Sequence, residues 1–65
     1  MTERVWRHRF VQALFEILRK TTGLGADKCY DLAFDDVDSY WREWNVFDSP
    51  EDAAQTAYKR MKEPG

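Results

Sequence analysis

The sequence predicts an all-α fold: one domain over residues 1–65, with two long helices and one short helix at about 3–21, 26–45 and 50–62. We expect this three-helix domain to form a dimeric helical bundle. Apolar residues recur at helical spacing in the first two segments, and a strong helix-start signal precedes the third. No segment alternates apolar and polar residues for long enough to suggest a strand.

The segment 26–44 has the clearest helical pattern, because nearly all of its apolar side chains share an arc of about 140° on a helical wheel. This apolar stripe consists of Ala26, Cys29, Tyr30, Ala33, Phe34, Val37, Tyr40, Trp41 and Trp44. Mostly acidic residues occupy the rest of the wheel, and Leu32 is the only apolar residue outside the stripe. We therefore expect the stripe to pack on other helices and Leu32 to be exposed, as an isolated candidate contact residue.

The first predicted helix begins after Thr2, a suitable N-cap, and has a wider apolar arc of about 200°. A three-helix monomer buries about 120 to 140° of such an arc, so one edge of this helix should stay uncovered. That edge carries Arg4, Arg7, Val11, Phe15 and Leu18. Arginines beside apolar and aromatic side chains are typical of protein interfaces, so we expect these residues to contact a second copy or another protein.

Local signals separate the three segments. Gly23 and Gly25 flank Leu24, and glycine supplies the left-handed backbone that ends many helices. Ser49 can cap the third helix, and Pro50 suits its first position. Two acidic residues follow in the first turn, where the helix dipole favours them.

Size and charge set further limits. A monomer of 65 residues buries only about 60% of the surface that its unfolded chain exposes, so its stability should be marginal. The net charge of −2 is segregated into +3 over 1–20, −7 over 21–52 and +2 over 53–65. With one cysteine, no signal-peptide pattern and no long apolar run, we expect a cytoplasmic protein that does not cross a membrane.

Residues for catalysis or metal binding are sparse. His8 is the only histidine and falls on the polar side of the first helix, with no nucleophile at a supporting spacing. Cys29 belongs to the apolar stripe and is most simply a small core residue. The aspartates of the middle segment lack the glycine and the terminal glutamate of a calcium loop. We therefore expect no enzyme, no cofactor and no metal site.

Two alternative functions that involve nucleic acid remain open. The basic first helix could contact phosphates in a helix-turn-helix protein, although the acidic middle segment opposes approach to a polyanion. In the inverse reading, the acidic helix imitates nucleic acid and blocks the basic groove of a DNA-binding protein. We regard direct nucleic-acid binding as the weaker alternative.

One resemblance adds to these expectations. The segments SYWREW (39–44) and SPEDAA (49–54) resemble a helix, loop and capped helix in small helical proteins of Mu-like temperate phages and prophages. In size, in its basic aromatic first helix and in the expected homodimer, the chain is also similar to phage quorum-sensing anti-activators of Pseudomonas. The resemblance implies a phage-encoded inhibitor of a host regulator, such as a LuxR-type transcription factor, with a pilus assembly ATPase as a further partner. It assigns no binding residue.

Overall fold

The computed structural model describes residues 1–63 and confirms an all-α fold with three α-helices and no strand in that range. They are α1 (Glu3–Thr22), α2 (Ala26–Trp41) and α3 (Pro50–Lys62), and a short 3-10 helix, η1 (Trp44–Val46), lies between α2 and α3. The helices have 20, 16 and 13 residues, so their lengths fall stepwise instead of forming two long helices and one short one.

The expected caps are formed at three helix ends. The Thr2 hydroxyl accepts a hydrogen bond from the Val5 N–H at 3.3 Å, which satisfies one of the free donors at the start of α1. Gly23 ends α1 with a φ of 72°, a backbone conformation that favours glycine. The Ser49 hydroxyl accepts from the Asp52 N–H at 3.1 Å, and Pro50 occupies the first turn of α3.

The second helix ends earlier than predicted. We expected it to reach about residue 45, but α2 ends at Trp41 and the chain tightens through a turn into η1. Its apolar pattern continues to Trp44, yet that side chain is 51% exposed. The early end lets the chain turn back, so that the Phe47 ring lies 5.8 Å from the Tyr40 ring, and α3 can begin beside α1.

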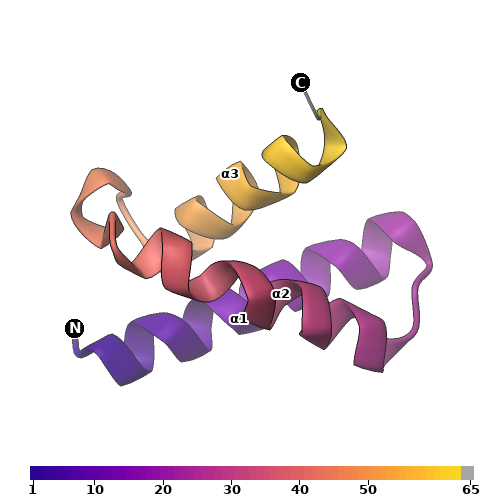
Figure 1. The fold of residues 1–65 in the computed structure, drawn as a ribbon, viewed down its shortest axis with the longest axis horizontal. Helices are drawn as coiled ribbons and strands as arrows, with labels where there is room; N and C mark the ends of the chain where they lie inside the picture. The colour runs from indigo at the N-terminus through magenta and orange to yellow at the C-terminus, as the bar shows by residue number, and fades with distance from the viewer. Residues whose placement is uncertain (64–65) are drawn as a thin grey trace.

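The helix α1 is the centre of the fold. Both α2 and α3 pack on α1, whereas α2 and α3 contact each other little (Figure 1). In Figure 1, α2 runs back along α1 after the loop at 23–25, and α3 then returns toward the other end of the molecule. Two helices therefore share the apolar surface of α1.

Because two helices pack on α1, the expectation that one edge of this helix stays uncovered is wrong. Val11 and Leu18 were expected to stay uncovered, but they are only 6% and 2% exposed. A wide apolar arc needs more than one neighbour, and α1 has two. The core residues are Trp6, Phe10, Val11, Leu14 and Leu18 of α1, Cys29, Ala33, Val37 and Tyr40 of α2, and Ala53, Ala54 and Ala57 of α3.

Polar contacts connect α1 to both of its neighbours. Arg7 forms ion pairs with Glu3 of its own helix and with Asp38 of α2. Arg9 donates two hydrogen bonds to the Glu51 carboxylate of α3, at 3.0 and 2.6 Å, in a bidentate pair. None of the helices within residues 1–63 is long and apolar enough to cross a bilayer.

Candidate protein-binding groove

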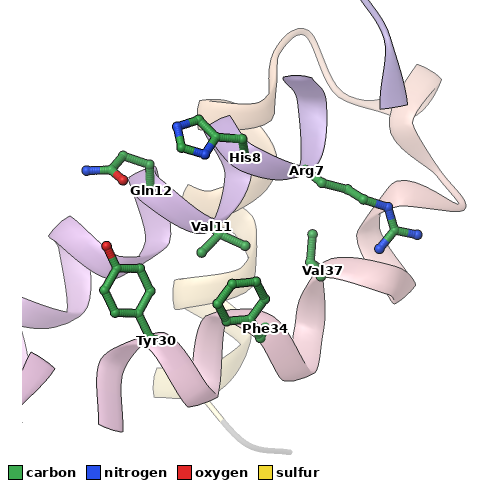
Figure 2. A pocket seen from close by; sticks show the side chains of 7 residues that line it. All are labelled: Arg7, His8, Val11, Gln12, Tyr30, Phe34 and Val37. Carbon is green, nitrogen blue, oxygen red and sulfur yellow. The ribbon is translucent and has the colours of Figure 1, made fainter. Parts of the chain in front are cut away.

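A groove lies between α1 and α2, on the side seen in Figure 2 with α3 running behind it. Its volume is about 300 Å³. We call it the groove face, and it is lined by Arg7, His8, Val11, Gln12, Tyr30, Phe34 and Val37. The two valines are buried and form its floor, while the polar side chains of α1 and the aromatic rings of α2 form its two banks (Figure 2).

The aromatic bank contradicts an expectation from the sequence. Tyr30 and Phe34 belong to the predicted buried stripe, but they are 37% and 60% exposed. Among the helices of residues 1–63, α2 packs closely on α1 alone, and one neighbour does not cover the whole apolar arc of α2. One edge of α2 therefore extends beyond α1, and large apolar side chains remain in contact with water.

These exposed rings form a small cluster with a residue of α1. Phe15 is half-buried, and its ring stacks on Tyr30 with a centroid distance of 4.1 Å and an interplanar angle of 20°. Tyr30 in turn lies 6.2 Å from Phe34, between ring centroids. Offset aromatic pairs at such distances are favourable, so the cluster has a defined shape on the surface.

Charges are distributed unevenly around the groove face. The ion pairs to Asp38 and Glu3 occupy Arg7, and hydrogen bonds to these carboxylates raise the pKa of its guanidinium. On α2, Asp27 and Asp31 are exposed and lie two turns and one turn before Phe34. The α2 bank is therefore acidic beside its exposed rings.

The α1 side of the groove carries charges of both signs. Three exposed charged residues, Arg4, Glu16 and Arg19, share the helix stripe of His8 and Gln12 at intervals of three, four or seven residues. Arg19 also donates a hydrogen bond to the Leu24 carbonyl at 3.3 Å. The α2 side of the groove is therefore acidic, whereas the α1 side carries both basic and acidic side chains.

The structure divides the residues that the sequence predicted as an interface. Arg7 and Val11 line the groove face, and Phe15 stacks on one of its rings. Leu18 and Leu32 instead line a second hollow where α1, α2 and α3 meet, together with Met61. Leu32 was expected to be isolated and exposed, but it is half-buried against the core because α3 passes beside it.

Sequence reasoning missed the most exposed aromatic residue of the groove face. Phe34 lies at the edge of the predicted stripe, with Asp31 and Asp38 one turn before and after it. This position at a boundary between apolar and acidic residues was the signal for partial exposure. Another exposed apolar side chain, Val46 of η1, is 72% exposed but is no part of the groove lining.

Side chains that could serve catalysis or metal binding are placed as follows in residues 1–63. His8 lines the groove, and no serine, threonine or cysteine lines it with His8. Cys29 is fully buried, and its thiol donates to the Leu24 carbonyl at 3.7 Å. No group of three or more histidine, cysteine or acidic side chains within residues 1–63 could hold a metal ion.

No protein-family model, no curated protein and no solved structure matches this chain.

Proposed function

We propose that this protein is a non-enzymatic protein–protein interaction module that binds other protein chains through the groove face. The observation that carries this proposal is Phe34, which is 60% exposed on a regular helix beside Tyr30 and above a floor of buried valines. Exposed aromatic patches with polar rims are typical of interfaces, because covering them removes apolar area from water. A rigid helix also presents these rings with little loss of entropy on binding.

The specific form that we propose is an inhibitor of a host transcription regulator, of the LuxR quorum-sensing type, with a pilus assembly ATPase as a further target. Its support is the resemblance to small proteins of Mu-like phages and prophages. Such an inhibitor needs no catalytic group, and the groove is lined by apolar and aromatic side chains, one amide, one imidazole and an arginine held in ion pairs. We place it in the cytoplasm with its targets.

A second candidate function is imitation of nucleic acid by the acidic side of α2. Asp27, Asp31 and Asp35 are exposed and recur every four residues, so they lie about 6 Å apart along the helix. Phosphates on one DNA strand are about 3.4 Å apart, so the charge density of this row is about half as high. That difference favours docking through the aromatic groove over imitation of nucleic acid.

The proposal is tested by capturing binding proteins with tagged wild-type protein and with two matched variants. An untagged copy of the chain is added to a lysate of the cells that carry the gene, so that both self-binding and binding to other proteins are recorded by mass spectrometry. The tagged Phe34→Ser variant should no longer capture the proteins that tagged wild type captures. Val46→Ser removes an exposed apolar side chain outside the groove face and should retain them.

Two results would decide against the proposal. Equal capture by wild type and Phe34→Ser would show that the groove face is not the docking surface. Binding that depends on Asp27, Asp31 and Asp35 and weakens steeply with salt would favour the nucleic-acid mimic instead.

A further inference from the structure

We propose that the groove face binds an amphipathic helix of another protein, and that this helix carries lysine or arginine side chains along the flank that lies beside α2. This inference rests on the proposed function, because it uses the same docking surface and specifies the chemistry of the partner. Its support comes from the backbone of the groove lining, from the length of the groove and from an acidic border on one side.

The backbone of the groove lining is already hydrogen-bonded. Every lining residue lies at least four positions from either end of α1 or α2, so its N–H and C=O groups pair within its own helix. An extended peptide would find no backbone partner here, and it would place its own polar groups over the floor formed by Val11 and Val37. A helix satisfies its backbone internally, so a helix is the element that fits this groove.

The groove has room for about two turns of such a helix. Its lining extends along α2 from Tyr30 to Val37, a rise of about 10 Å (Figure 2). A helix laid along the groove can therefore place apolar side chains from two successive turns against Phe34 and the valine floor.

The acidic border lies directly outside the exposed rings of α2. Around this helix from the groove floor, Val37 comes first, Phe34 follows about 60° further on, and Asp31 about another 60° further on. Asp27 lies one turn before Asp31 and about 20° beyond Phe34, and both aspartates are exposed. Within residues 1–63 neither aspartate belongs to an ion pair, so both charges are available to a partner.

Neighbouring charges do not cancel this border. The other exposed charged residues of 26–42 are Lys28, Asp35, Asp38 and Arg42. Lys28 lies about 120° round from Phe34, twice as far as Asp31, and Arg42 lies more than two turns beyond Phe34. Asp38 pairs with Arg7, and Asp35 adds a further negative charge. The α2 side therefore remains acidic where a partner helix would lie.

The α1 side of the groove sets no such requirement. Arg4, Glu16 and Arg19 are exposed there and carry both signs. A partner helix therefore needs positive charge only on the flank beside α2. A lysine or arginine on that flank can lay its methylene stem on the Phe34 ring and place its charge beside Asp31.

The inference is tested with synthetic helical peptides and the full chain. The first peptide has leucines on one face and lysines along one flank, and it can bind in either direction, so its lysines can reach α2. A second peptide has glutamates in place of these lysines. A third has the lysines moved to the side opposite the leucines, with the same net charge. By calorimetry at low salt, the first should bind at least about tenfold more tightly than the second and about threefold more tightly than the third.

One pair of variants tests the apolar contact. Phe34→Ser should bind the first peptide at least about tenfold more weakly than wild type, because the exposed ring is the main apolar contact of the α2 side. Val46→Ser changes an exposed apolar side chain outside the groove lining and should match wild type. Circular dichroism confirms that each variant keeps its helices.

A second pair of variants tests the acidic border. Asp27→Asn with Asp31→Asn should reduce the preference for the first peptide over the second to about twofold or less. Glu43→Gln with Asp48→Asn removes the same net charge at exposed positions outside the groove lining, and it should keep the wild-type preference.

Several results would overturn the inference. They are equal affinity of wild type for the first two peptides, no binding of the first peptide at millimolar concentration, and binding that Phe34→Ser does not weaken. Self-association that the first peptide does not displace would identify a second copy as the occupant and would also overturn it.

Failure of this inference is distinguishable from failure of the proposed function. If tagged wild type captures a protein that Phe34→Ser does not capture, while the peptides show no preference, the groove face is a docking surface for a partner of different chemistry. If Phe34→Ser changes neither capture nor peptide binding, both proposals are wrong.

Discussion

The two contacts of α1 differ in the size of the side chains that form them. α3 meets α1 through Ala53, Ala54 and Ala57, which are all fully buried, so small side chains let this helix approach closely. α2 meets α1 largely through aromatic rings, and part of that aromatic edge stays in water. A helix with a narrow apolar stripe buries all of it on one neighbour, whereas a wide stripe leaves an edge that another molecule can cover.

The largest expected effect concerns the buried side of the aromatic contact. Phe10 is fully buried, stacks on Trp6 at 5.5 Å and lies 5.3 Å from Tyr40 of α2, between ring centroids. Phe10→Ala should lower the free energy of unfolding by about 3 to 5 kcal/mol, which is enough to unfold much of so small a domain. Thermal denaturation followed by circular dichroism measures this, with Phe34→Ala as the exposed control. Similar losses for both variants would contradict the division into a buried and an exposed aromatic side.

The alanine contact should be sensitive to larger side chains. Ala57→Leu inserts three carbon atoms where α3 lies close to α1, and it should destabilise the fold by about 1 to 3 kcal/mol. Gln55→Leu is the matched control, because Gln55 is exposed on the same helix. Urea denaturation measures both variants. If Ala57→Leu is as stable as Gln55→Leu, the contact between α1 and α3 is looser than this comparison requires.

A smaller effect should depend on pH. Burial beside α3 and the negative charge of Asp35 raise the pKa of Asp36 above its ordinary value of 3.8. The folded state therefore binds the proton more tightly than the unfolded state, and Asp36 contributes most to stability below 3.8 and loses this contribution as pH rises through its folded pKa.

Asp36→Asn should therefore raise the midpoint of thermal unfolding slightly at pH 7, and the gain should shrink as the pH falls toward 4. Asp31→Asn, on the exposed side of α2, is the control for a general loss of negative charge. A gain of equal size for Asp31→Asn would mean that the local environment of Asp36 has no part in the effect.

The smallest effect on stability is expected at the exposed edge. Phe34→Ser removes a ring that is largely in water, so the free energy of unfolding of the monomer should change by less than about 0.5 kcal/mol. Measured at low concentration, where a dimer does not form, this change isolates folding from association. A large loss of monomer stability would mean that Phe34 belongs to the core, and the comparison between the two contacts of α1 would fail.

Local chemistry explains which parts of the fold were predictable. The caps at Thr2, Gly23 and Ser49 depend on a few neighbouring residues, and the sequence indicates them directly. The chain turns after the end of α2 and places Phe47 against Tyr40, a contact between side chains outside the helical pattern. The spacing of apolar residues along the chain does not predict such a contact.

The candidate site was predicted in part for a related reason. A helical wheel measures the width of an apolar stripe, but it does not show how many neighbours share that stripe. Two neighbours cover Val11 and Leu18, so these residues are buried, while Tyr30 and Phe34 lie on a helix with one large neighbour and remain exposed. The prediction that Val11, Leu18 and Leu32 are exposed is therefore wrong, and the exposed apolar side chains of the groove face are on α2.

The central position of α1 also determines which helix can unfold first. Because α2 and α3 touch each other little, α3 can detach while the α1–α2 hairpin stays closed, at the loss of the Arg9–Glu51 pair and the alanine contact. Amide hydrogen exchange should then occur sooner in α3 than in α1. A protease that enters through this partial opening would cut first near the turn at 42–49, and the remaining hairpin would still carry the groove face.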